Sequence, residues 1–173
     1  MRAIIIGNLG SGKSTLAANL VEEGTNIALL NLDTLAWSKT APIRRRPFSE
    51  SAEEIDTFIK GNTKWVIVGC YSDLIRHALE SSTHLYFLNL TMEKCVMNSM
   101  NRPCEPRKYG SKYKQDANLP LIVKWIRSYN KREDELSYHS HRAIFDSFSG
   151  WKTEIYSNLK MERTKSIRSS PLS

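Results

Sequence analysis

The pattern G-x-x-x-x-G-K-[ST] is matched without interruption by residues 7–14, and it constrains the fold more than any other feature of this sequence. The apolar, β-branched run over residues 2–6 comes immediately before it and predicts a buried strand. Residues 15–21 follow directly and predict the start of a helix. The order of strand, glycine loop and helix is the context in which this pattern indicates a phosphate-binding loop, or P-loop.

The expected chemistry of such a loop follows from its backbone. Glycines allow N–H groups to turn inward around phosphate oxygens, and the helix N-terminus adds a partial positive charge. Lys13 would reach the terminal phosphates of a nucleoside triphosphate, and the Ser14 hydroxyl would hold Mg²⁺. The residues predicted to bind the nucleotide are Gly7, Asn8, Leu9, Gly10, Ser11, Gly12, Lys13, Ser14 and Thr15.

The length and composition fit one domain of a globular protein. The chain has 173 residues, of which 40% are hydrophobic and 25% charged. No apolar stretch approaches the roughly 18 residues that cross a membrane, and no signal peptide is expected before the first strand. The three cysteines, Cys70, Cys95 and Cys104, lack metal-ligand spacing and fit a reducing compartment. These features predict a cytoplasmic protein without a membrane partner.

The net charge of +7 is unevenly distributed. Residues 158–173 contain four basic side chains and one acidic side chain, and their polar composition predicts a disordered tail. Residues 1–157 form the predicted domain. Their remaining positive charge suits a protein that handles nucleotides, but it is also compatible with RNA or DNA binding.

Apolar runs alternate with helical patterns, which predicts an α/β fold with a five-stranded, mostly parallel sheet flanked by helices. Ser51 and Glu54 have the spacing of a capping box, and Thr91 can cap a later helix. A long helix is expected at about 118–138, with its aromatic residues packed in the core. The predicted strands cover residues 2–6, 27–32, 65–68, 85–90 and 152–156.

Residues 102–117 contain two prolines, a glycine and five basic side chains, with little that could be buried. This composition predicts a mobile basic loop. The run of arginines at 44–46 has three interpretations: a solvated face, a clamp for an anionic substrate, or a nucleic-acid contact. The four histidines do not cluster on one face, and none is predicted to be a metal ligand.

The segment GSGKSTL at 10–16 is similar to the loop of the small P-loop kinases, the adenylate and shikimate kinase group. Residues 32–37 and 65–71 resemble, more narrowly, the FlaR-like and shikimate-kinase-like ATP-binding proteins of bacteria. The resemblance covers most of the chain and implies a P-loop NTPase fold that binds ATP and Mg²⁺. It also implies that the basic loop at 102–117 is the lid that these kinases close over the nucleotide.

The resemblance assigns roles to three more side chains. Asp33 matches an aspartate beside Mg²⁺ and the acceptor hydroxyl, and ligands of open α/β sheets do bind at the carboxyl ends of strands. The alternative is that Asp33 is only a helix or turn cap before Thr34. Arg102 and Arg107 match lid arginines that stabilise charge on the transferring phosphoryl group, and the alternative is a solvated basic loop.

The third predicted strand departs from a common P-loop pattern because no acidic residue follows it. Residues 65–68 lead into Gly69, and Asp73 comes four residues later. Either Asp33 alone completes the metal shell through water, or turnover is weak.

The glycine loop and the resemblance together predict a kinase that transfers the γ-phosphoryl group of ATP to a small acceptor, either a metabolite hydroxyl or a nucleotide. A nucleotide-dependent regulatory or nucleic-acid-binding ATPase, and a plain NTPase, are the alternatives.

Overall fold

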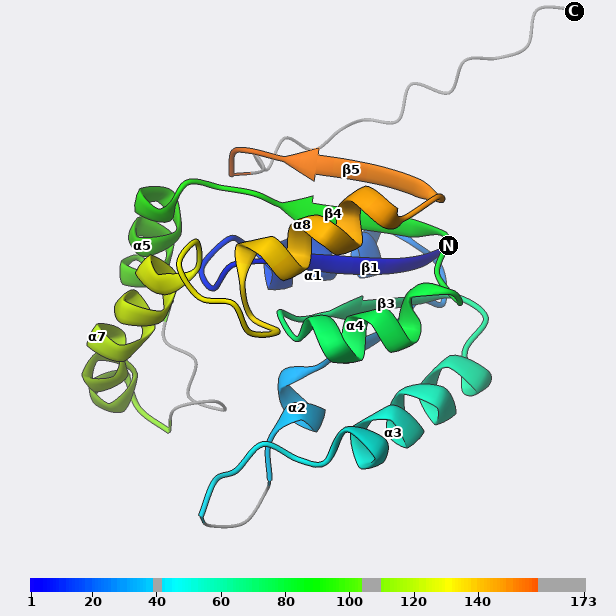
Figure 1. Cartoon of the computed structure of the whole chain (residues 1–173), viewed down its shortest axis with the longest axis horizontal. Coiled ribbons are helices and arrows are strands. Elements are labelled where there is room, and N and C mark those ends of the chain that lie inside the picture. The colour runs from blue at the N-terminus through cyan, green and yellow to red at the C-terminus, as the bar shows by residue number, and fades with distance from the viewer. Residues whose placement is uncertain (39–41, 104–109, 159–173) are drawn as a thin grey trace, which may run out of the picture.

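The computed structural model describes residues 1–38, 42–103 and 110–158, and these form an α/β fold around one sheet (Figure 1). The sheet has five strands in the order β2-β3-β1-β4-β5, and every neighbouring pair is parallel. The predicted five-stranded sheet is confirmed, and all its pairings are parallel. The strands are β1 (Arg2–Gly7), β2 (Ala28–Asn31), β3 (Trp65–Val68), β4 (His84–Leu88) and β5 (Trp151–Ile155).

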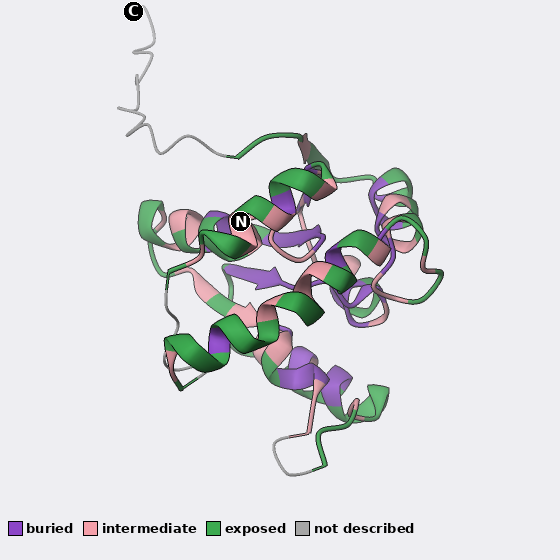
Figure 2. Ribbon diagram, turned by 90° about the vertical axis from the view of Figure 1, so that its left-hand side faces the viewer, coloured by how far each residue is buried: buried purple, intermediate pink, exposed green. Residues whose placement is uncertain are grey.

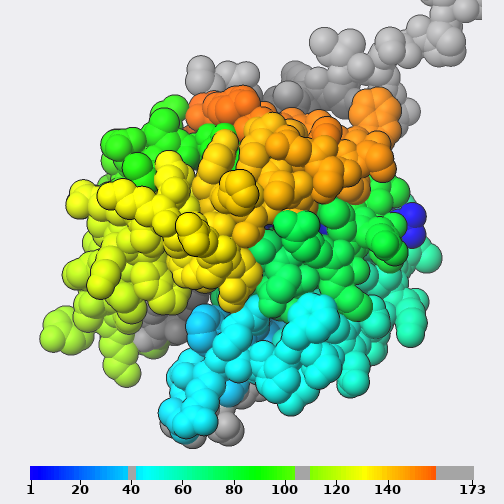
Figure 3. All heavy atoms as spheres, in the orientation of Figure 1, coloured from blue at the N-terminus to red at the C-terminus, as the bar shows by residue number. Residues whose placement is uncertain are grey.

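Helices cover both faces of this sheet, so its central strands are buried on both sides (Figure 2). Ile4 and Ile6 of β1 belong to the core beneath α4 and α8, whereas Ala3 and Ile5 belong to the core beneath α1, α5 and α7. Figure 3 shows α8, α4 and α3 side by side across the first of these faces. The helices are α1 (Lys13–Glu23), α2 (Asp33–Ala36), α3 (Phe48–Gly61), α4 (Ser72–Leu79), α5 (Met92–Met100), α7 (Lys112–Ser128) and α8 (Tyr138–Ser147).

Two predicted helix caps have different outcomes. The Thr91 cap is confirmed, because its hydroxyl accepts a hydrogen bond from the Lys94 N–H at 3.3 Å. The capping box at Ser51 and Glu54 is wrong, since α3 already begins at Phe48. Ser51 is instead buried within the helix, and its hydroxyl donates to the Leu35 carbonyl oxygen at 2.9 Å. A tertiary hydrogen bond has taken the place of the local cap.

The predicted division of residues 102–138 into a loop and one long helix is also wrong. α7 begins at Lys112, where the Ser111 side chain caps it, so the second part of the predicted loop is helical. α7 ends at Ser128, and a turn leads to α8, which the helical pattern did not predict. The Ser137 hydroxyl caps α8 by accepting from the Ser140 N–H at 3.0 Å. Two serine caps therefore decide these boundaries.

The aromatic and apolar positions of the helix predicted at about 118–138 were expected to pack in the core. Ile126 and Tyr129 are buried, but Leu121 and Trp125 are 51% and 37% exposed. The predicted tail from residue 159 onward lies outside the described residues, as does Arg107. No helix in the described part of the chain is both long and apolar enough to span a bilayer.

Candidate functional site

The glycine loop, which we define as residues 7–15, joins β1 to α1 at the carboxyl edge of the sheet. Gly10 and Gly12 have φ angles of 72° and 92°, a region that favours glycine. A Cβ atom on Gly10 would lie 2.2 Å from the Cys95 carbonyl oxygen, so this position has no room for a side chain. A Cβ on Gly7 would similarly lie 2.5 Å from the Leu88 carbonyl oxygen. The glycines thus allow the loop to lie against the main chain of its neighbours.

Side-chain amides hold the glycine loop in place. The Asn8 amide nitrogen donates to the Ile126 carbonyl oxygen at 3.1 Å, and its oxygen accepts from the Leu9 N–H at 2.8 Å. From the other side, the Asn98 amide nitrogen donates to the Gly10 carbonyl oxygen at 2.8 Å. The loop is therefore tied to both α5 and α7.

Lys13 is the first residue of α1 and folds back over the loop. Its Nζ donates to the carbonyl oxygens of Gly7 and Asn8, at 3.0 and 2.7 Å. Burial lowers the pKa of Lys13, while the neighbouring Asp33 opposes that shift. Gly12 caps α1 without a side-chain acceptor, and the first turn contains no acidic residue. The positive end of the helix dipole is therefore not offset by a local carboxylate.

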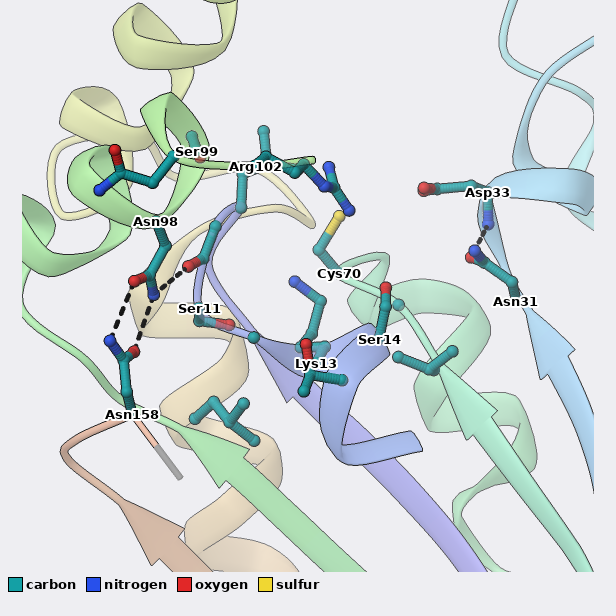
Figure 4. A pocket seen from close by; sticks show the side chains of 18 of the residues that line it. Ser11, Lys13, Ser14, Asn31, Asp33, Cys70, Asn98, Ser99, Arg102 and Asn158 are labelled. Carbon is teal, nitrogen blue, oxygen red and sulfur yellow. Dashed lines mark hydrogen bonds between the residues drawn. The ribbon is translucent and has the colours of Figure 1, made fainter. Parts of the chain in front are cut away.

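A cavity of about 360 Å³ opens over the glycine loop (Figure 4). Asp33 and Asn31 line it from the end of β2, and Arg102 lines it from the segment that follows α5. Asn98 and Asn158 line the opposite end, where each amide nitrogen donates to the other's oxygen at 2.8 and 3.0 Å. The glycine loop with Lys13 forms the cationic floor of the cavity, with the Asp33 carboxylate at one end and the two amides at the other.

The structure brings most of the predicted site residues together. Residues 9–15 line the cavity together with Asp33 and Arg102, whereas Gly7 and Asn8 support the loop without lining the cavity. Arg107 is outside the described residues. Asp73 does not line the cavity; it forms an ion pair with Arg45 at 2.8 Å.

The arginine run at 44–46 is largely engaged within the protein. Arg45 contacts Asp73, and Arg46 forms ion pairs with Glu50 and Glu54 at 3.3 and 2.7 Å. Arg44 is exposed. The run therefore mainly fastens the segment after α2 to α3 and α4.

The sequence did not predict three side chains that contribute to the site. Asn98 and Asn158 are sixty residues apart and belong to no motif, so only the fold brings their amides together. Tyr71 ends the segment 65–71 that carries the resemblance but had no predicted role, and its hydroxyl donates to Asp33 Oδ1 at 3.0 Å. No local pattern predicts either contact, because each depends on where β3, α5 and β5 end in space.

The donor set suits a phosphate better than a metal bound by protein alone. Among the described residues, no three His, Cys, Asp or Glu side chains converge as metal ligands. Asp33 is the one carboxylate among the lining side chains that the structure describes. Ser11 Oγ is buried in the loop and has no hydrogen-bond partner within the described protein. Such an orphaned polar atom beside a cationic floor fits a bound anion.

Neither a protein-family model nor a curated protein matches the chain. Among solved structures, TT1252 from Thermus thermophilus is similar over 91% of this chain and 89% of its own, with a TM-score of 0.53 and 14% identity. An uncharacterised protein from Eubacterium ventriosum matches over 90% and 89%, with a TM-score of 0.48 and 18% identity. A chain of the Pnkp1/Rnl/Hen1 RNA repair complex matches over 76% of this chain and 46% of its own, with a TM-score of 0.42 and 17% identity. The first likeness shows a shared α/β fold.

Proposed function

We propose that this protein is a P-loop kinase that binds ATP in the cavity and transfers the γ-phosphoryl group to a small acceptor, a metabolite hydroxyl or a nucleotide. One observation carries the proposal. The glycine loop, with Lys13 and the α1 N-terminus, faces a cavity that Asp33 and Arg102 also line. A triphosphate needs the first of these features for binding, and phosphoryl transfer needs charged groups around the reacting oxygens.

The loop residues fit a bound triphosphate. Lys13 Nζ already lies at the loop and holds two carbonyl oxygens, which phosphate oxygens would replace as partners. The buried Ser11 hydroxyl would gain a partner from the same oxygens. Ser14, exposed at the start of α1, would ligate Mg²⁺, and Asp33 would hold one of the waters of the ion. When bound, Mg²⁺ neutralises charge on the phosphates.

Asp33 and Arg102 are the side chains to which we assign the chemistry. Asp33 would orient the acceptor hydroxyl or the water on Mg²⁺, and Arg102 would stabilise charge that develops on the phosphoryl oxygens. Cys70 lines the cavity just after β3, where many P-loop proteins carry an acidic residue. Asp33 therefore performs the carboxylate role alone in this proposal.

The alternative is a nucleotide-dependent regulatory or nucleic-acid-binding ATPase. Its support was the basic tail and the arginine run. Arg45 and Arg46 are held in ion pairs with acidic side chains, which weakens the second support. Binding to generic RNA or DNA that falls steeply with salt and depends on ATP would favour this alternative.

The test compares ATP binding with single-turnover ADP formation across a panel of hydroxyl metabolites and nucleotides. We expect Asp33→Asn and Arg102→Gln to lower acceptor-dependent turnover at least tenfold with a much smaller effect on the affinity for Mg²⁺-free ATP, because their contacts strengthen in the transition state. Glu53→Gln, on the exposed surface of α3, and Arg127→Gln, on the exposed surface of α7, are the controls. Turnover at the parent rate in both site variants would refute the kinase assignment.

A further inference from the structure

Two aromatic side chains are joined to Asp33 by a row of hydrogen bonds. The Trp37 indole N–H donates to the Tyr71 hydroxyl at 2.7 Å, and that hydroxyl donates to Asp33 Oδ1 at 3.0 Å. Trp37 follows α2, whereas Tyr71 follows β3. The row therefore links the segments that follow two neighbouring strands, β2 and β3, to the carboxylate that lines the cavity.

The direction of this row is fixed by chemistry. An indole N–H can only donate, so the Tyr71 oxygen accepts from Trp37, and its proton is directed at Asp33. Burial raises the pKa of Tyr71, and the neighbouring Cys70 and Asp33 raise it further. Each donor polarises the next, which strengthens the bond that reaches the carboxylate.

The row is held rigidly before any ligand arrives. Tyr71 is 5% exposed, and the Arg45 guanidinium lies over its ring, 4.6 Å from the centroid. Arg45 is itself fixed by two hydrogen bonds to Asp73, at 3.0 and 2.8 Å. The Trp37 ring meets the Tyr71 ring edge-on at 6.5 Å. A cation, an aromatic edge and a hydrogen bond therefore leave Tyr71 little freedom.

We infer that Tyr71 is a positioning residue that fixes the Asp33 carboxylate for the Mg²⁺–nucleotide complex, and that Trp37 acts through Tyr71. This inference rests on the proposed function. With Oδ1 held by Tyr71, the carboxylate cannot rotate freely about the Cβ–Cγ bond of Asp33, so its orientation toward the cavity is set in advance. Preorganisation of this kind lowers the cost of forming the contact with the hydrated ion.

The test measures ATP affinity with and without Mg²⁺, so it does not depend on turnover. We expect Tyr71→Phe to leave the Mg²⁺-free affinity unchanged, and to reduce by roughly tenfold the factor by which Mg²⁺ tightens binding, because a hydrogen bond to a charged group is lost. Trp37→Phe should reduce the factor less. The double variant should equal Tyr71→Phe, since the indole N–H reaches Asp33 only through the tyrosine hydroxyl.

Tyr86→Phe is the matched control, because Tyr86 is a half-buried tyrosine on β4 that does not line the cavity. Asp33→Asn gives the full loss of Mg²⁺ coupling for reference. If Asp33→Asn abolishes the coupling and Tyr71→Phe retains it, or if Trp37→Phe and Tyr71→Phe act additively, the inference is overturned while the proposed function stands. If the unmodified protein binds no ATP, the proposed function fails, and the inference falls with it.

Discussion

Alanine substitution at three glycines tests the backbone geometry on which the site depends. Gly10 has a φ of 72°, and a Cβ there would lie 2.2 Å from the Cys95 carbonyl oxygen and 2.4 Å from Ser99 Oγ. Gly12 has a φ of 92°, but its Cβ would meet nothing closer than Leu88 Cδ2 at 3.9 Å. Gly61, at the end of α3, has no neighbour within 4 Å and no positive φ.

These differences set the expected order of effects. Gly12→Ala should lower the free energy of unfolding by about 1–2 kcal/mol, the cost of a left-handed conformation for a residue with a Cβ. Gly10→Ala pays the same strain and must also push the glycine loop away from the α5 backbone, which adds about 1–3 kcal/mol. Gly61→Ala should be neutral or stabilise the protein by up to about 1 kcal/mol, because alanine favours a helix.

The assay is urea denaturation of the three variants, together with ATP affinity. We expect Gly10→Ala to lose most ATP binding as well as stability, because relieving the overlap with Cys95 moves the loop itself. Gly61→Ala serves as the matched control for the substitution. Equal stability of Gly10→Ala and Gly12→Ala would contradict this prediction, since the close approach to the Cys95 carbonyl oxygen would then not exist.

Three further predictions concern single features of the site and core. Lys13→Ala should abolish ATP turnover, and normal ADP release by the folded variant would contradict this expectation. The same variant should lower the free energy of unfolding by no more than about 2 kcal/mol, because it removes only hydrogen bonds to two loop carbonyls. Removal of residues 160–173 should leave ATP affinity unchanged, because the described lining ends at Asn158, and lost binding would show that the tail belongs to the site. Burial lowers the pKa of His141 from 6.5 to about 4. Between these pH values the unfolded chain therefore binds more protons than the folded protein. The free energy of unfolding should fall by roughly 3 kcal/mol as the pH drops from 6.5 to 4. In His141→Gln this part of the pH dependence, measured by denaturation at each pH, should disappear.

The sequence predicted the sheet well because its strands are dominated by one physical signal. A strand buried on both faces needs a continuous apolar run, and residues 2–6 and 65–68 provide it. Strand ends were predicted to within a residue or two. The helices of the second half were harder, because their ends depend on caps at Ser111 and Ser137 in a polar stretch without a clear period.

The site divides in the same way. The glycine loop could be predicted from residues 7–15 alone, since positive φ angles, close backbone approach and a lysine at the helix start are local requirements. The fold was needed to reveal the pairing of Asn98 with Asn158 and the row from Trp37 through Tyr71 to Asp33. Their partners lie far apart along the chain. A hydrogen bond between residues thirty to sixty positions apart leaves no periodicity in the sequence, and it forms only where parallel strands end at a common edge of the sheet.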